Sequence, residues 1–173
     1  MIVEGIVIAI IIGYIRKGRF INFENLQIKL WYLIIFSQLL QIIAIRLNGT
    51  IINLNQNYFY NVHILSYIIL LIPLIINYKL LSMKLLCIGT ILNLIPIALN
   101  NGQMPVFVPK GLQCSLDLGH TFGNTMTKAY LLTDIIPIMR PYPLPKIISI
   151  GDIFLFMGIF LLIQQGMLKN KKK

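Results

Sequence analysis

The chain has 173 residues, of which 57% are apolar and only 12% are charged, and its mean hydropathy is +0.81. The charged share is about half that of a typical soluble protein, which excludes both a water-soluble globular domain and a disordered segment. The net charge of +10 comes from 15 Lys and Arg against 5 Asp and Glu. In a membrane protein this balance indicates cationic loops beside an anionic leaflet, not a nucleic-acid site. The sequence therefore predicts an integral membrane protein whose partner is the lipid bilayer, with no nucleic-acid partner.

Five apolar runs bounded by charged or polar residues predict five membrane-spanning helices in one domain, residues 1–173. They cover residues 2–15, 30–45, 59–78, 81–99 and 148–168. The first run is short, since a helix of that length reaches roughly 21 Å against a hydrocarbon core of about 30 Å. Its basic residues follow the apolar stretch, which is the reverse of a signal peptide, so we expect a retained helix. The expected fold class is an all-α integral membrane protein, a five-span helical bundle.

Basic residues are unevenly divided between the two sets of segments that flank these spans. The segments after the first and third spans, together with the C-terminal tail, hold ten of the 15 Lys and Arg, and the longer remaining segments hold five. By the positive-inside rule, the first set is cytoplasmic. The N-terminus is then expected outside and the C-terminus inside, which agrees with five spans.

The segment of residues 100–147 is expected to lie outside and to carry structure of its own before the last helix. A connection of this length between helices is well above the usual range and is typically functional. It contains the turn signal Asn101-Gly102 and a stretch with four prolines, Pro137, Pro141, Pro143 and Pro145.

Asp134 and Asp152 are each flanked by apolar residues near the predicted outer membrane boundary. The proline-rich stretch between them turns the chain, so their carboxylates could face each other. Two neighbouring carboxylates cannot both ionise cheaply, so one keeps a proton and the pair supplies a general acid and a general base. We therefore hypothesise that Asp134 and Asp152 are a catalytic pair for water attack on an amide or ester.

A structural interpretation of the same two residues stays open. Ser149 and Asp152 fit the S/T-x-x-D/E pattern of a capping box, in which Asp152 stabilises the start of the last helix. Asp134 could instead pair with Arg140 or Lys128.

Three segments, NNGQMPV at 100–106, LTDIIPI at 132–138 and ISIGDIFLFMGI at 148–159, resemble a family of small bacterial multi-pass membrane proteins. That family is found often in Firmicutes and is catalogued as a domain of unknown function. The resemblance covers most of the chain and implies a bacterial cell membrane, with no known activity. Here a single Gly102 follows Asn101 where the family has two glycines, and Thr133 stands where glycine is commoner.

A partial resemblance links the second half of the chain to lipoprotein signal peptidase (signal peptidase II). It rests on Gly123-Asn124, on residues 132–136 and on Ile150-Gly151-Asp152 before an apolar helix. Asp134 and Asp152 fall on that family's two catalytic aspartates, which implies an aspartyl intramembrane hydrolase acting on a membrane-anchored peptide or lipoprotein. Thr127 and Lys128 stand where that family has Asp and Arg.

The residues expected to bind such a substrate flank the two aspartates. They are Asn100, Asn101, Gly102, Met104, Pro105, Gly123 and Asn124. For the first five, the alternative is a structural turn at the end of the fourth helix. Gln38, Gln41 and Asn93 are expected to form interhelical hydrogen bonds or a polar path.

No cofactor and no metal are expected, because the two histidines and two cysteines lack the spacing of a metal site. Cys87 and Cys114 fall on opposite sides of the predicted topology, so no disulfide is expected. His120 is interpreted as a loop histidine, and Glu4 as solvated or paired with a loop cation. Three function classes stay open: a hydrolase for a peptide or lipid-linked substrate, a non-enzymatic accessory or structural membrane protein, and a small transporter or ligand-binding subunit.

Overall fold

The structure, a computed structural model, describes residues 2–47, 56–109, 116–139 and 145–168, and most of these residues are helical. The α-helices are α1 (Ile2–Ile15), α2 (Trp31–Leu47), α3 (Gln56–Ile76), α4 (Leu81–Leu99) and α5 (Ile150–Leu168). Each coincides with one of the five predicted apolar runs. The largest difference in a boundary is at the start of α3, which begins at Gln56 instead of residue 59.

Three helices of the described chain are long and apolar enough to cross a membrane. They are α3, over Tyr58–Ile76, and the whole of α4 and α5. The other two are shorter, with 14 residues in α1 and 17 in α2. Large apolar side chains are exposed on all five helices, as expected of surfaces that face lipid.

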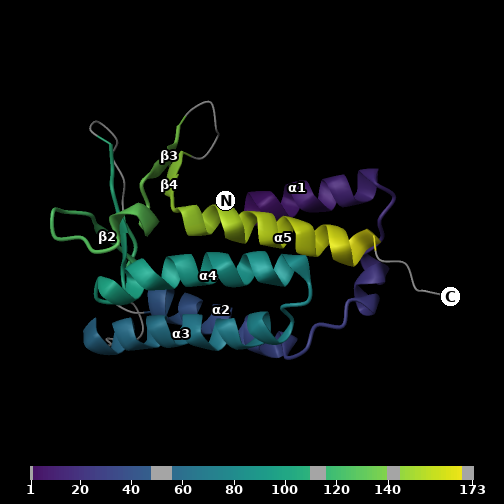
Figure 1. Ribbon diagram of the computed structural model, residues 1–173, viewed down its shortest axis with the longest axis horizontal. Coiled ribbons are helices and arrows are strands. Elements are labelled where there is room, and N and C mark those ends of the chain that lie inside the picture. Colours follow the sequence, from purple (N-terminus) through teal and green to yellow (C-terminus); the bar gives the residue numbers. More distant parts are fainter. Residues whose placement is uncertain (1, 48–55, 110–115, 140–144, 169–173) are drawn as a thin grey trace.

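Helix α5 lies between α1 and α4, and α3 packs against α4 on the other side, with α2 beside α3 (Figure 1). Glycines bring α4 and α5 close together. A Cβ atom on Gly89 would lie 2.7 Å from the Gly151 carbonyl oxygen, and one on Gly158 would lie 2.9 Å from the Leu86 backbone nitrogen. In lipid, such close backbone approach is a main source of helix association, so α4 and α5 form the tightest pair of the bundle.

The connection from α1 to α2 closes the end of the bundle where α5 terminates. It contains the short 3₁₀ helix η1 (Phe20–Asn25). The Arg19 backbone N–H and the Asn22 side-chain amide both donate to the carbonyl of Met167 in α5. Near the start of α4, the Asn77 side chain bonds both the N–H and the carbonyl of Lys29, which ties α3 to the residues before α2.

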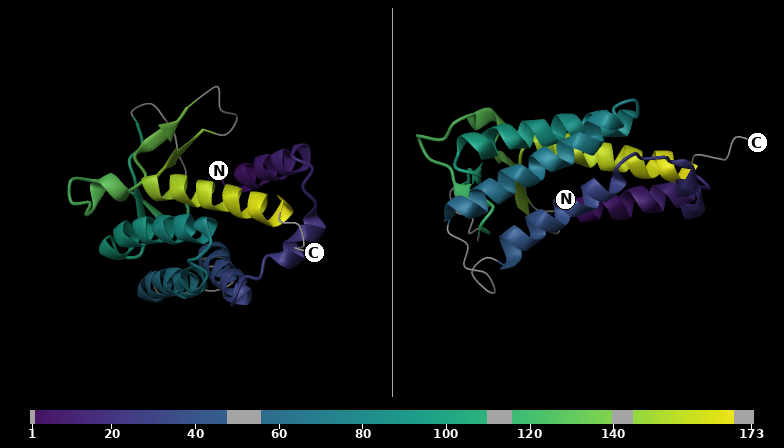
Figure 2. Two further views of the ribbon diagram at one scale, coloured as in Figure 1. Left: turned by 45° about the vertical axis from the view of Figure 1, so that its right-hand side comes forward. Right: turned by 90° about the horizontal axis from the view of Figure 1, so that it is seen from below.

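The opposite end of the bundle carries the strands, as Figure 2 shows, and we call it the strand end. Strand β1 (Met104–Val106) pairs in parallel with β2 (His120–Phe122), with Met104 opposite His120. Strand β3 (Ile136–Ile138) pairs antiparallel with β4 (Lys146–Ile148), with Ile136 opposite Ile148. The 3₁₀ helix η2 (Tyr130–Leu132) lies between β2 and β3. The expectation that residues 100–147 carry structure of their own is therefore confirmed for the described residues.

Two local contacts fix the strand end to the helices. After α4, Asn101 and Gly102 both adopt positive φ, 56° and 74°, and the Gly102 N–H donates to the Ile97 carbonyl, so the predicted turn is confirmed. The Lys146 ammonium of β4 lies 2.6 Å from the Glu4 carboxylate of α1. The predicted pairing of Glu4 with a loop cation is confirmed as well.

Candidate functional site

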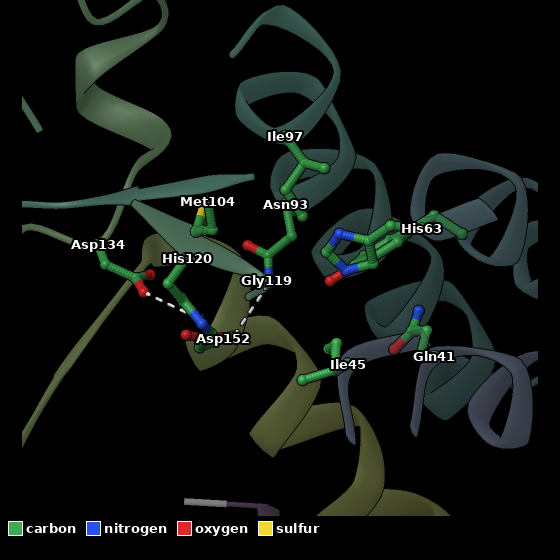
Figure 3. Close-up of a pocket in the computed structure, with 11 residues that line it drawn as sticks. Gln41, Ile45, His63, Asn93, Ile97, Met104, Gly119, His120, Asp134 and Asp152 are labelled. Atoms are coloured by element: carbon green, nitrogen blue, oxygen red, sulfur yellow. Dashed lines mark hydrogen bonds and ion pairs between the residues drawn. The ribbon is translucent and has the colours of Figure 1, made fainter. Parts of the chain in front are cut away.

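A pocket of about 190 Å³ lies at the strand end and brings α2, α3, α4, β1, β2 and the start of α5 together (Figure 3). Both aspartates singled out in the sequence line it. The other lining residues are Gln41, Ile45, His63, Tyr67, Asn93, Ile97, Met104, Gly119 and His120. This volume is smaller than that of the cavities that bind drug-sized ligands.

Asp152 stands in the first turn of α5 and is held by three hydrogen bonds. The Ser149 N–H donates to Oδ2, and the Asp152 N–H donates to the Ser149 hydroxyl at 3.0 Å. This reciprocal pair is a capping box, so that interpretation of the sequence is confirmed. The Asn93 amide donates to Oδ1 at 2.9 Å, and its own carbonyl oxygen accepts from the Ser149 hydroxyl. Asp152 is thus fixed by both its own helix and α4.

The backbone of Asp134 is hydrogen-bonded to β1, where it forms a one-residue parallel bridge with Val106. Its N–H donates to the Pro105 carbonyl, and its own carbonyl accepts from the Phe107 N–H. The side chain is buried in the pocket, and Oδ1 has no hydrogen-bond partner among the described residues. Burial, reinforced by the charge of Asp152, raises the pKa of Asp134 to about 7. Near neutral pH this carboxyl group therefore exists in both protonation states.

His120 is the site residue that sequence analysis missed. Its Nδ1 lies 2.6 Å from Asp117 Oδ1, and its Nε2 lies 3.8 Å from Asp134 Oδ2. Figure 3 shows the side chains of Asp134 and His120 directed toward each other, while Asp152 is joined to Asn93. Burial lowers the pKa of His120, but the hydrogen bond that His120 donates to Asp117 and the charges of the three aspartates outweigh this effect, and the pKa is raised overall. The spacing of Asp117 and His120, three residues apart beside a glycine, was the only signal in the sequence.

His63 contributes a second imidazole to the pocket wall. Its Nδ1 lies 2.7 Å from the Gly102 carbonyl oxygen. A carbonyl oxygen only accepts, so Nδ1 carries the proton and donates it. The turn after α4 thereby fixes the orientation of a ring on α3, with the Tyr67 ring against its edge at 5.5 Å between centroids.

Of the seven residues predicted to bind substrate, one lines the pocket and six do not. Met104 lines the pocket, whereas Pro105 is buried beneath Asp134 and contributes only its carbonyl. Asn100 bonds the backbone of Lys128, and Asn101 and Gly102 form the turn. Gly123 packs against Phe107, and the Asn124 side chain accepts from the Met126 N–H. In the described residues these other six have structural contacts and do not line the pocket.

The remaining polar residues singled out in the sequence have different positions in the structure. Gln41 and Asn93 line the pocket, whereas Gln38 is exposed elsewhere on α2, so the three residues do not converge. Within the described ranges, Asp134 forms an ion pair with His120, and no ion pair joins it to Lys128. Arg140 and Cys114 lie outside the described residues, while Cys87 is a free thiol in α4. No group of three or more His, Cys, Asp or Glu side chains in the described part of the chain is arranged to hold a metal ion.

Comparison with known proteins matches the chain over residues 25–164 to the model of a family of unknown function, DUF5317. An uncharacterised protein of Thermotoga maritima is 37% identical over 99 residues, which is 56% of this chain and 59% of that relative's length. The chain thus spans somewhat over half of the relative it matches. No solved structure is significantly similar to it. The matched region runs from before α2 into α5 and includes the whole pocket, and the chain belongs to the DUF5317 family.

Proposed function

We propose that this chain is a five-span membrane protein whose strand end faces outward and hydrolyses an amide or ester in the pocket of Asp134 and Asp152. The observation that carries the proposal is the placement of both carboxylates in the lining of one small pocket, one of them buried with a free oxygen. The short motifs that resemble lipoprotein signal peptidase point to the same pair of aspartates. The substrate class is a membrane-anchored peptide or lipid-linked molecule.

The proposed topology has the N-terminus outside and the C-terminus in the cytoplasm of a bacterial cell. The cations after α1 and between α3 and α4 lie at the end of the bundle away from the strands. They therefore agree with a cytoplasmic face there. Helices α1 and α2 span in this proposal by packing against longer neighbours and locally thinning the bilayer.

The proposed reaction starts with Asp134 protonated and Asp152 ionised. Water gives a proton to Asp152 as its oxygen bonds to the carbonyl carbon, while Asp134 gives its proton to the carbonyl oxygen. The bond to the leaving group then breaks. The leaving group takes the proton from Asp152, and one hydroxyl returns its proton to Asp134. The two carboxyl groups end as they began, and one water has been added across the bond.

The charge of the site favours a neutral acyl group over a phosphate as the reacting part. Asp134, Asp152 and the nearby Asp117 place three carboxyl groups around two histidines. An anionic group would meet like charges in a poorly solvated pocket, which costs free energy. An amide or ester carbonyl carries no net charge and can accept the proton of Asp134.

A non-enzymatic structural role is the second candidate, and the hydrogen bonds of Asp152 favour it. Both of its oxygens already accept bonds, from the Ser149 N–H and the Asn93 amide, as a helix cap requires. In that case Asp152 stabilises the α4–α5 pair and performs no chemistry. The two candidates differ in whether Asn, which can still cap a helix, replaces Asp152 without functional loss.

The test is cleavage of a quenched fluorescent peptide that carries one transmembrane segment and a diacylglyceryl cysteine. The purified full chain is reconstituted in lipid nanodiscs with this probe. If the protein is a hydrolase, the wild type cleaves the peptide. The cleavage rate then falls at least about a hundredfold in both Asp134→Asn and Asp152→Asn. Glu24→Gln is the matched control, because it removes one carboxylate from an exposed position in η1 at the other end of the bundle.

Two results contradict the proposal. One is cleavage at the wild-type rate by both Asn variants that elute as monodisperse protein. The other is no cleavage by the wild type together with unchanged membrane-peptide and lipoprotein processing in cells that carry either variant. The second result favours the structural role.

A further inference from the structure

A second cavity adjoins the candidate pocket at the strand end. It measures about 480 Å³ and is lined by residues of β2, by the residues before β2, and by Ile45 and Gln103. His120 and Ile45 line both cavities, whereas Asp117 lines only the second one. The His120 ring therefore stands at the boundary between the two spaces.

Three side chains form a series of decreasing exposure across this boundary. The exposed fraction is 52% for the Asp117 side chain, 38% for His120 and 7% for Asp134. Asp134 thus has little direct contact with solvent, although its proposed role requires it to hold a proton at the start of each cycle. His120 contacts it from the exposed side.

We propose that Asp117 and His120 form a proton relay that links solvent in the second cavity to the buried carboxyl group of Asp134. The inference rests on the proposed function, since the relay lets the buried Asp134 reach the protonated state in which that reaction starts, and the reaction itself then returns the proton to Asp134. Both residues act through Asp134 and are positioning residues, not catalytic ones.

Hydrogen bonding decides which nitrogen of His120 faces which carboxylate. Asp117 Oδ1 accepts from the Gly119 N–H at 2.9 Å and lies 2.6 Å from His120 Nδ1, so Asp117 orients the ring through Nδ1. Nε2 is then directed at Asp134 Oδ2. Their separation of 3.8 Å exceeds a hydrogen bond by about 1 Å, a gap that a small side-chain rotation or one bridging water closes.

The transfer conserves protons at each step. The imidazolium gives its Nε2 proton to the Asp134 carboxylate and becomes the neutral tautomer, in which Nδ1–H remains bonded to Asp117. A hydronium ion from the second cavity then protonates Nε2 again and is left as water. The reverse sequence removes a proton from Asp134.

Several groups face Asp134 and set the balance of this exchange. They are His120 on β2, Asp152 on α5, His63 and Tyr67 on α3, and Asp117 beyond His120. The positive imidazolium lowers the pKa of Asp134, against the larger effects of burial and Asp152 that raise it. Conversely, the pKa of His120 is raised. Because the pKa of Asp134 is raised to about 7, this carboxyl group takes up and releases its proton near neutral pH, where the neighbouring imidazole can exchange protons with it.

The test follows the carboxylic acid C=O band of Asp134 by infrared spectroscopy of the full chain in nanodiscs, without any substrate. Asp134→Asn identifies the band by removing it. His120→Gln is expected to raise the pH midpoint of the band, because the attraction of the imidazolium for the carboxylate is lost. After a rapid pH jump, the band is expected to relax at least about tenfold more slowly. Asp117→Asn is expected to change the pH midpoint and the relaxation rate of the band in the same directions but by less. Glu24→Gln is expected to change neither quantity.

An unchanged midpoint and relaxation rate in both His120→Gln and Asp117→Asn overturns the relay, whatever the peptide assay gives. If both variants slow the relaxation while the wild type leaves the peptide intact, the relay is supported and the proposed hydrolysis fails. The two proposals can therefore fail separately.

Discussion

The carboxyl group of Asp134 is buried, and its Oδ1 has no hydrogen-bond partner in the part of the chain that the structure describes, so this residue couples stability to pH. The pKa of the group rises from 3.8 in the unfolded chain to about 7 in the folded one. The contribution of Asp134 to the stability of the folded protein is therefore most favourable at low pH, where the group is protonated in both states. This contribution falls as the pH rises between these two values, because only the unfolded chain then ionises freely.

Asp134→Asn removes that ionisation and keeps the shape of the side chain. We expect the variant to gain stability relative to the wild type as the pH is raised from about 4 to about 7, by up to roughly 4 kcal/mol for a pKa raised from 3.8 to about 7. The measurement is the difference in melting temperature between the two proteins in one detergent across this range. A difference that stays constant with pH would mean that Asp134 is not buried as a neutral acid.

At the scale of single residues, the sequence predicted the two carboxyl groups but not their environment. Asp134 and Asp152 stood out because apolar residues flank them. His120 did not, because its contact with Asp134 depends on β2 lying beside β1, and a three-residue parallel pair leaves no periodic pattern in a sequence. Likewise the turn at Asn101-Gly102 was predictable from residue type, whereas its bond to His63 depends on tertiary packing.

At the scale of elements, the helices followed directly from the hydropathy pattern. Each apolar run ends at charged or polar residues, and in lipid a helix satisfies its own backbone, so composition alone fixes the approximate bounds. Strands β3 and β4 were not predicted individually. They have three residues each, and β3 contains Pro137, which is usually a signal against a strand and is tolerated in this two-stranded pair.

The glycines between α4 and α5 give a prediction at this scale. A Cβ on Gly158 would meet the Leu86 backbone and side chain within 3 Å, so Gly158→Ala must push the helices apart. We expect a loss of about 1–3 kcal/mol in the free energy of unfolding. Denaturant unfolding in micelles, followed by circular dichroism, measures it. Ile153→Ala is the control on the same helix, since that side chain is 39% exposed. Equal stability of both variants would contradict the close packing.

At the scale of the whole molecule, the proposed orientation can be tested by chemical labelling. In a background of Cys87→Ser and Cys114→Ser, single cysteines are introduced by Thr125→Cys at the strand end and by Lys79→Cys between α3 and α4. Both positions are exposed. We expect a membrane-impermeant maleimide to label the first in intact cells and the second only after permeabilisation. The reverse pattern would mean that the strand end lies in the cytoplasm. Labelling of both cysteines in intact cells would contradict the proposed topology, because it would place both positions outside.

The contact between Glu4 and Lys146 joins the first turn of the first helix to the strand that leads into the last one. Further along, Gln164 of α5 donates to the Ala9 carbonyl, and the Gly5 backbone lies against the Phe156 ring. A bulky fusion partner placed before residue 2 would therefore crowd the same anchor that steadies the entrance to α5 and, through it, the carboxylate of Asp152. Any change that displaces the first turn of α1 is therefore expected to reach the start of α5 through Lys146.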